Sequence, residues 1–406
     1  MKTWVLLSTA AAAAMAGGYK IPESSVNATA LGAAYVANAH GADAAYYNPA
    51  AMIYNEDANL LEIDATYIGL TPIDFAGTSG NYSSKRENFL VPTLHFASKK
   101  LGDNGARAGL AIVVPAGLSK RWDAQPAKGS AQEFTLETVE FNPSIAIPLG
   151  DTLSAGAGFR IVYSSGVVKA QIPGIYSQDM SGDATSYGYN LALNYRPLSD
   201  LSLAVTYRSR IDLGIEGDAD LSHTGGIIPG DPLPTFSGNY GASVTIPLPA
   251  ALNLAAAYTF ETGTTVEAVF ERTFWSDYKT LNFDFSHPYA EGFFGRAKDK
   301  SWTDSSSYRL GLTQQYDRWT AMAAVAYDET PVPESTLGYE LPDSDAWLVS
   351  LGGRYEVDEH WNIGMAALAD LKKSRRIDGA INDNGIDGEF SNARAYLVTA
   401  GIGYRF

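Results

Sequence analysis

Four arginines each lie next to an aromatic residue in segments where apolar and polar residues alternate. The pairs are Phe159-Arg160, Tyr207-Arg208, Tyr308-Arg309 and Arg354-Tyr355. Because neighbouring side chains of a strand point to opposite faces, an aromatic ring on the outside puts the arginine on the inside. An enclosed guanidinium binds carboxylates through strong, charge-assisted hydrogen bonds. We therefore expect these four arginines to be candidate ligand-binding residues for an anionic group.

The same alternation leaves a structural alternative open for these arginines. It also places acidic residues on the inner face, namely Glu62, Asp64, Glu267 and Glu271. Ion pairs between the two sets would brace the interior and leave no cation for a ligand. Binding and bracing are thus both compatible with the pattern.

Residues for covalent or metal chemistry are missing or scattered. Cysteine is absent, which excludes disulfides and thiol nucleophiles. The five histidines have no metal-ligand spacing, and they are His40, His95, His223, His287 and His360. No G-x-S-x-G motif is present, and the calcium-loop-like run 378–389 has Ala380 where an oxygen ligand is needed. We therefore expect no enzyme activity, no bound metal and no cofactor.

The composition excludes a nucleic-acid partner and points to a β-rich chain. Lys and Arg number 29 against 45 Asp and Glu, giving a net charge of -16 that would repel a polyanion. Charged residues make up only 18% of the chain, below the roughly 25% usual in soluble domains. With 24 tyrosines and 39 glycines, the chain fits a protein whose surface does not all face water.

The first 16 residues have the pattern of a secretory signal peptide. Lys2 gives a basic start, an apolar run follows from Trp4, and Ala14-Met15-Ala16 supplies small residues at a cleavage site. The apolar run is shorter than the roughly 18 residues of a membrane-spanning helix. We expect export and cleavage after Ala16.

The rest of the chain alternates with a period of two, which is typical of amphipathic strands. The odd positions of 187–195, 201–207 and 347–355 are apolar or aromatic, apart from Gly353. No apolar run after Gly17 is long enough for a spanning helix, so any membrane crossing must use strands.

Connection lengths favour an up-and-down barrel in an outer membrane. Six short polar connections and seven long loops rich in Gly, Asp, Ser and Pro alternate along the chain, which makes 14 strands. Residues 172–184 are one of the expected loops. Splitting 240–260 at Pro247 and Pro249 would make the strand number odd, so we expect one bent strand there. The predicted fold is an all-β, 14-stranded antiparallel transmembrane barrel over residues 58–406.

Residues 17–57 precede the first clear strand and do not alternate. They are rich in Ala, Gly and Asn. A barrel of 14 strands is wider than its own side chains can fill, so we expect this segment to form a hatch inside the lumen. Tyr19 and Ile21, near its start, are expected to reach a ligand pocket.

The C-terminal strand carries an assembly signal and completes the expected location. Residues 396–406 alternate and end in the aromatic Phe406, like the signal by which outer-membrane barrels are recognised by the barrel-assembly machinery. Aromatic residues beside the short turns fit an interfacial girdle. We expect a monomer in the Gram-negative outer membrane, in contact with its lipid and lipopolysaccharide.

Several motifs in this order resemble the FadL/TodX family of outer-membrane transporters for long-chain fatty acids and other hydrophobic compounds. In the first 57 residues they are Gly18-Tyr19, 31–35 (LGAAY) and Asn48-Pro49-Ala50. Further along they are 207–209 (YRS), Leu248-Pro249, Trp275-Ser276, 308–310 (YRL), the run 319–333, 341–343 (LPD) and Trp347-Leu348. The resemblance spans essentially the whole mature chain.

The resemblance implies a barrel with an inward kink in its third strand, where a hole in the wall lets substrate leave sideways into the membrane. It also implies that Asn48, Pro49 and Ala50 of the hatch lie at this kink. In this chain the third strand contains Pro115 and Gly117. Proline lacks a ladder donor and glycine adds backbone freedom, so these two residues support a broken ladder.

A transporter of hydrophobic small molecules is the favoured function, and the hatch is the reason. A general porin for small polar solutes needs an open lumen, and a structural or adhesive barrel would be expected to have larger loops. The basic pocket residues of the family have no clear counterpart here, since the fifth strand runs 163–166 (YSSG) without a cation before Lys169. Fatty acids and neutral hydrocarbons therefore both stay open as substrates.

Overall fold

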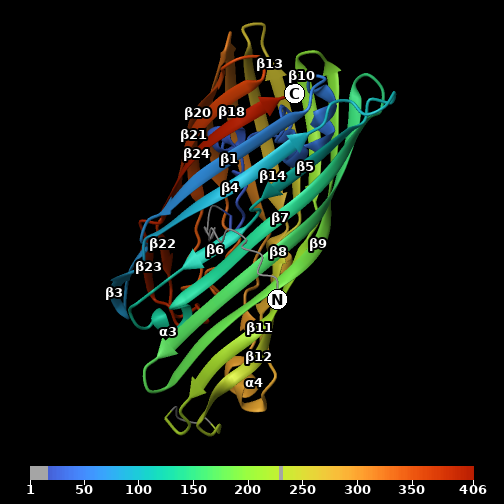
Figure 1. Ribbon diagram of the computed structural model, residues 1–406. Helices are drawn as coiled ribbons and strands as arrows, with labels where there is room; N and C mark the ends of the chain where they lie inside the picture. Colours follow the sequence, from blue (N-terminus) through green and yellow to red (C-terminus); the bar gives the residue numbers. More distant parts are fainter. Residues whose placement is uncertain (1–16, 228–231) are drawn as a thin grey trace.

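The computed structural model describes residues 17–227 and 232–406 and is a closed antiparallel barrel (Figure 1). The expected signal peptide, residues 1–16, lies outside the described residues. Three wall strands consist of two segments each, namely β5 (Arg107–Val113) with β6 (Gly117–Lys120), β10 (Leu201–Arg208) with β11 (Ile211–His223), and β12 (Phe236–Leu248) with β13 (Ala251–Thr259).

The other wall strands are continuous. They are β1 (Leu60–Leu70), β4 (Glu87–Ala97), β7 (Glu133–Pro148), β8 (Leu153–Ile172), β9 (Tyr176–Leu198), β14 (Thr264–Thr273), β18 (Ser305–Tyr316), β19 (Trp319–Asp328), β20 (Ala346–Glu356), β21 (Trp361–Lys372) and β24 (Arg394–Arg405). With the three divided strands the wall has 14 strands, as the connection pattern predicted. β1 pairs with β24 from Leu60↔Arg405 to Leu70↔Ala395, so no strand edge is left open at this seam.

Short elements lie in the hatch and in the long loops. The hatch contains α1 (Val26–Ala30), α2 (Ala44–Tyr47) and the 3-10 helix η1 (Pro49–Tyr54). The loops contain β2 (Asp74–Gly77), β3 (Gly80–Ser83), α3 (Lys128–Ala131), η2 (Trp275–Asp277), β15 (Thr280–Leu281), β16 (Phe283–Phe285), α4 (Pro288–Phe294), β17 (Lys298–Asp299), β22 (Arg375–Ile377) and β23 (Gly388–Ser391). No helix in the described ranges is long and apolar enough to cross a bilayer.

The region 240–260 forms one wall strand, as expected. β12 pairs with β11 and β13 pairs with β10, so the chain continues in one direction through the interruption at Pro249 and Ala250. Proline has no N–H for the ladder, which explains a bend without a reversal.

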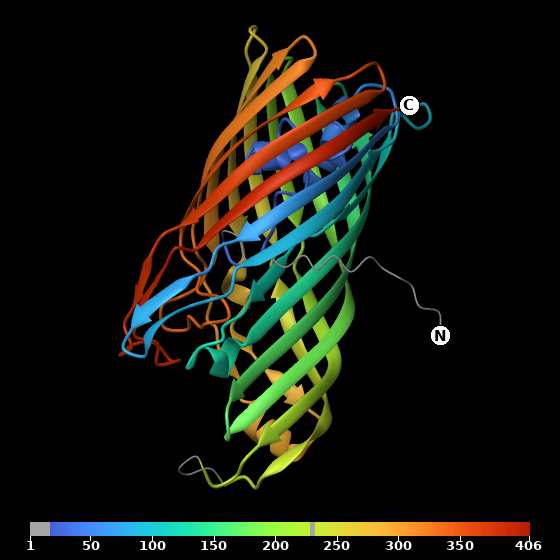
Figure 2. The same cartoon turned by 60° about the vertical axis from the view of Figure 1, so that its left-hand side comes forward.

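The prediction of a loop at 172–184 was wrong. β8 and β9 pair from Leu153↔Tyr195 to Ile172↔Tyr176, which leaves only 173–175 as a turn. Where a strand extends beyond the lipid, its outer face does not have to be apolar. The polar composition of 172–184 therefore resembled that of a loop although the segment is mostly strand. Figure 2 shows β8, β9, β11 and β12 projecting past the rest of the barrel on the side of the long loops.

The helices of the hatch lie inside the other end of the barrel, towards the short turns and the C-terminus (Figure 1). Its alanines pack against wall glycines, because a Cβ on Gly352 would lie 2.6 Å from the Ala30 Cβ, and one on Gly311 would lie 3.0 Å from the Ala34 Cβ. The small-residue composition of the hatch therefore allows close backbone approach to the wall.

Candidate ligand pocket and wall openings

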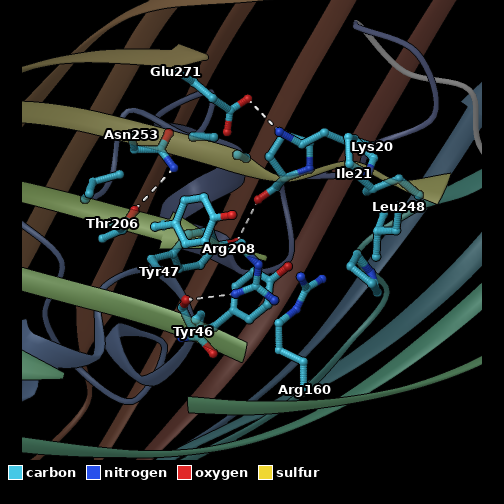
Figure 3. Close-up of a pocket in the computed structure, with 18 of the residues that line it drawn as sticks. Lys20, Ile21, Tyr46, Tyr47, Arg160, Thr206, Arg208, Leu248, Asn253 and Glu271 are labelled. Atoms are coloured by element: carbon cyan, nitrogen blue, oxygen red, sulfur yellow. Dashed lines mark hydrogen bonds and ion pairs between the residues drawn. The ribbon is translucent and has the colours of Figure 1, made fainter. Parts of the chain in front are cut away.

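A cavity of about 80 Å³ lies between the hatch and the wall (Figure 3). Its lining comes from the start of the hatch, from η1, and from β8, β9, β10, β13, β14 and β18, together with the proline-rich interruptions of two strands. Since one water needs roughly 10–15 Å³ of such space, the cavity holds a short part of a ligand, and a longer molecule needs an adjoining passage.

Four cationic side chains reach this cavity, and Figure 3 labels three of them: Lys20, Arg160 and Arg208. The fourth is Arg309. Parity correctly placed the three arginines inside, since Arg160 and Arg309 are buried while Phe159 and Tyr308 are half exposed.

Acids pair with each of these cations. Glu140 lies 2.9 Å from Arg160 Nη2 and also binds Arg208, whose guanidinium lies 4.2 Å from the centre of the Tyr46 ring. Glu271 lies 2.8 Å from Lys20 Nζ and 3.6 Å from Arg309.

The third acid is Asp328, which lies 3.4 Å from Arg309. Among these contacts, Arg160 and Arg208 share one carboxylate, that of Glu140, so this pair of wall arginines carries one positive charge more than its acid. This balance combines both expected roles, because the pairs brace the lumen and the excess suits one bound carboxylate.

Glu23 of the hatch lies near the other group of charges, with Arg309, Asp328 and Asp370 around it. Burial, the main cause, raises the pKa of its carboxyl from 4.5 to about 8, although Arg309 acts in the opposite direction. The neutral form therefore prevails at pH 7. Neither carboxyl oxygen has a hydrogen-bond partner among other described residues.

Arg354 lies apart from this cavity. It binds Glu62 and donates hydrogen bonds to Asn27 at 2.6 Å and Asn362 at 2.9 Å. With Arg405 it lines a separate polar cavity of about 460 Å³ near the short turns. The structure thus brings three of the four predicted arginines together and places the fourth at the opposite end of the hatch.

Tyr19 and Ile21 lie on either side of the boundary between pocket and loops. Ile21 lines the cavity and packs in an apolar cluster with Val91 and Val114. The Tyr19 ring lies among loop aromatics, 4.8 Å from Trp275 and 5.8 Å from Trp302 between ring centres. Its hydroxyl donates to the Pro247 carbonyl.

The third strand is interrupted between β5 and β6. β4 pairs with β5 only from Leu94↔Ile112 to Ala97↔Gly109, and the pairings of β6 in the described chain are all with β7. Residues 87–93 of β4 therefore have no ladder partner on this side of the wall.

The start of the hatch takes the place of the missing ladder. The Ile21 N–H donates to the Pro115 carbonyl at 3.0 Å, and the Gly117 N–H donates to the Tyr19 carbonyl at 2.9 Å. Lys20 and Ala116 form the bridge between these two bonds. A backbone segment of the hatch thus covers this opening.

Asn48, Pro49 and Ala50 lie against another part of the wall. The Asn48 amide donates to the Val36 carbonyl and to Asn194 of β9, both at 2.8 Å. Ser154 of β8 donates to the Ala50 carbonyl at 2.8 Å, and Pro49 lines the cavity. The backbone partners of the interrupted strand come from Tyr19 and Ile21, and Asn48 binds β9.

Sequence reasoning missed Lys20 and Glu140. Glu140 lies between Val139 and Phe141, which are 47% and 41% exposed, so strand parity could have placed it inside. Lys20 lies in a segment without alternation, and no pattern signals its direction.

Comparisons with known proteins agree with this architecture. A family model described as outer membrane protein transport protein (OMPP1/FadL/TodX) matches residues 7–406. The long-chain fatty acid transport protein of Escherichia coli K12 is 25% identical, over 97% of this chain and 95% of that protein.

Two solved structures share the fold. The crystal structure of a Pseudomonas aeruginosa FadL homologue has a TM-score of 0.83 at 20% identity and covers 96% of this chain and 99% of its own. The Pseudomonas putida toluene transporter TodX has a TM-score of 0.72 at 17% identity and covers 94% of this chain and 98% of its own. The chain belongs to the OMPP1/FadL/TodX family of transport proteins in the Gram-negative outer membrane, and is a transporter, not an enzyme.

Proposed function

We propose that this protein takes up hydrophobic molecules with one anionic end, long-chain fatty acids foremost, and releases them sideways into the membrane at the third-strand break. The observation that carries this proposal is that Arg160 and Arg208 share a single acid, Glu140, at a cavity that also borders Ile21 and Pro115. The related protein of Escherichia coli is named as a long-chain fatty acid transport protein.

Lateral release fits the energetics of such a ligand. An alkyl chain gains roughly 0.8 kcal/mol for each CH₂ removed from water, so an axial route through an aqueous lumen is strongly unfavourable. The break between β4 and β6 borders apolar residues, among them Phe89, Val91 and Val114. A chain that displaces Ile21 would pass from the cavity to lipid without entering water.

The proposed organisation follows from this function. Residues 1–16 direct export, 17–57 form the hatch, and 58–406 form the barrel, which works as a monomer and is assembled through the strand ending in Phe406. Among the residues that we propose to act on the ligand are Tyr19, Ile21, Arg160, Arg208 and Arg309. Pro115 and Gly117 form the gate, while Asn48, Pro49 and Ala50 seat the hatch on the wall.

Neutral aromatic hydrocarbons are a second candidate substrate. Every cation of the cavity is already paired with an acid, and the Tyr19 ring packs in an aromatic cluster with Trp275, Trp302 and Tyr278. A relative of the same fold is named as a toluene transporter.

One uptake experiment separates these substrates. The protein is expressed in a Gram-negative host that lacks its own long-chain fatty acid transporter, and uptake of labelled palmitate, labelled toluene and a labelled disaccharide is compared. Palmitate uptake well above the empty-vector control is expected. Uptake of toluene alone would replace the first substrate with the second, and uptake of the disaccharide would contradict both.

A further inference from the structure

The wall has a second interruption, between β9 and the strand formed by β10 and β11. Pairing joins β9 to β10 as far as Asn190↔Arg208, and it joins β9 to β11 only from Asp183↔Glu216 onward. Residues 184–189 and 209–215, all of them described, face one another in between. At one end of this gap the Ser209 N–H donates to the Tyr189 carbonyl at 2.8 Å, and the Tyr189 N–H donates to the Ser209 hydroxyl at 2.9 Å. In its middle the Ser186 hydroxyl donates to the Asp212 carbonyl at 2.9 Å.

The gap lies where unpaired backbone is tolerable. Tyr187 and Tyr189 on its outer side are 62% and 49% exposed, as aromatic residues at the edge of the lipid would be. Arg210 and Asp212 beside them are exposed and form an ion pair at 2.7 Å. Water and lipid head groups at this level can satisfy backbone groups that the hydrocarbon core could not.

One apolar side chain closes the gap from the inside. Gly188 has no side chain, and a Cβ placed on it would lie 2.6 Å from Cγ1 of Ile211. Ile211 is buried, and so is Leu213, the next inward residue of β11. The plug of this opening is therefore a side chain, which changes rotamer without breaking a hydrogen bond of its own. The Ser186 hydroxyl is the one further contact that must be released from the Asp212 carbonyl.

The gap adjoins both the ligand cavity and an apolar groove on the lipid side. Leu191 and Tyr207, which point outward, line the cavity as well as the groove. The groove measures about 460 Å³ and includes Ile147, Leu193 and Val205. Cavity and groove thus meet at the pair Leu191↔Tyr207, which is next to the last pair of the β9–β10 ladder, Asn190↔Arg208.

The head-group site is fixed to the edge of the same gap. Arg208 is the last paired residue of β10, and Arg160 Nη1 donates to the Ser209 carbonyl at 2.7 Å. A carboxylate held by these arginines places the first atoms of its alkyl chain at the edge of the gap, where Asn190 and Arg208 line the cavity.

We propose that the gap between β9 and β11 is a second lateral opening, gated by Ile211, through which the alkyl chain of a bound single-chain anionic amphiphile reaches the outer groove. The identity of the ligand rests on the proposed function, but the opening does not depend on the third-strand exit. An anionic head in the cavity and a tail in an apolar groove are the two ends of one such molecule.

A reversible clamp tests the opening in a chain that has no cysteine of its own. Gly188→Cys with Ile211→Cys places two thiols across the gap, and Leu312→Cys with Ala323→Cys is the matched pair across an intact ladder. Palmitate uptake is measured in the host described above, before and after oxidation and again after reduction. Oxidation should at least halve uptake with the first pair, reversibly, and leave the control pair unchanged.

Further outcomes keep the test decisive. Combining the oxidised clamp with Pro115→Val and Gly117→Val should reduce uptake to background, while binding of palmitate to the clamped protein in detergent stays unchanged. Ile211→Ala should speed uptake, whereas Leu221→Ala, further along β11, should not. Unchanged uptake after complete oxidation would overturn the proposal, as would failure of the two thiols to join. Absence of uptake by the reduced protein would instead contradict the proposed function.

Discussion

The two interruptions of the wall are closed by different parts of the chain. At the third strand, the backbone of Tyr19 and Ile21 supplies hydrogen bonds to Pro115 and Gly117. At the second interruption, the side chain of Ile211 fills the space beside Gly188. Opening the first requires a hatch segment to leave its backbone partners, whereas opening the second requires one side-chain rotation and the loss of one hydrogen bond, from the Ser186 hydroxyl to the Asp212 carbonyl. The first opening is thus suited to a slow, ligand-driven step and the second to a fast one.

The largest expected effect is on palmitate affinity, and it should differ between a cation on the wall and a cation on the hatch. Arg208→Gln should weaken palmitate binding by roughly tenfold to hundredfold, because a hydrogen bond to a charged group contributes about 1.5–3 kcal/mol. Lys20→Gln should have a smaller effect, since Lys20 belongs to the hatch and does not share an acid with Arg160 as Arg208 does.

Titration of the purified variants with palmitate and with hexadecanol measures this difference. Hexadecanol has no carboxylate, so its affinity should change little in either variant. Equal losses for palmitate and hexadecanol would mean that Arg208 supports the fold of the pocket and does not bind the head group.

Removing one backbone donor should weaken the seal of the third strand. Ile21→Pro deletes the N–H that donates to Pro115 and should cost about 1–3 kcal/mol of hatch docking, since it leaves a buried carbonyl unpaired. Ion conductance across planar bilayers should rise in this variant and stay low in Ile21→Val, which keeps the donor. A low conductance in both would show that side-chain packing alone closes this opening.

Adding a single methyl group at Gly188 should lower the stability of the wall at the second interruption. Gly188→Ala forces Ile211 to shift and should cost about 1–3 kcal/mol, typical of overpacking a close contact. Gly214→Ala is the matched control, because nothing lies within 4 Å of its added Cβ. Thermal unfolding in detergent measures both variants, and equal unfolding temperatures would mean that the gap is wider than the structure has it.

The smallest expected effect is a change in pH dependence. The pKa of Glu23 is raised in the folded hatch, so folding costs free energy once an unfolded carboxyl would ionise. Stability should fall as pH rises from about 4.5 to about 8 and stay level above that range. Glu23→Gln should flatten this slope of unfolding temperature against pH, and an unchanged slope would assign the pH dependence to other groups.

The strands that cross lipid were predictable from sequence because lipid imposes a period of two on them. Arg160 and Arg309 were placed inside by the same argument, and Glu140 obeys it. The register of 172–184 was not predictable, since a strand outside the lipid shows no apolar face.

The contacts that close the two openings were also not predictable from the sequence. At the third strand, the Ile21 N–H and the Tyr19 carbonyl form backbone hydrogen bonds. Any residue type can form such bonds, so the sequence does not indicate them. The second interruption leaves no signal in the apolar pattern either, because apolar residues stay at odd numbers while the inward positions change from even (Ala204, Thr206) to odd (Ile211, Leu213). A shift of one residue within a strand indicates a bulge.

The seam between β1 and β24 has a consequence for biogenesis. The N–H and carbonyl of Phe406 both bond to Asn59, at 3.0 and 2.9 Å, and β24 also pairs with β21 along its other edge. A strand has only two edges, so a factor that reads the C-terminal strand by adding to it must leave before β1 arrives. The hatch precedes β1 directly, so the pairing of β1 with β24 that closes the wall also encloses the hatch in the finished barrel.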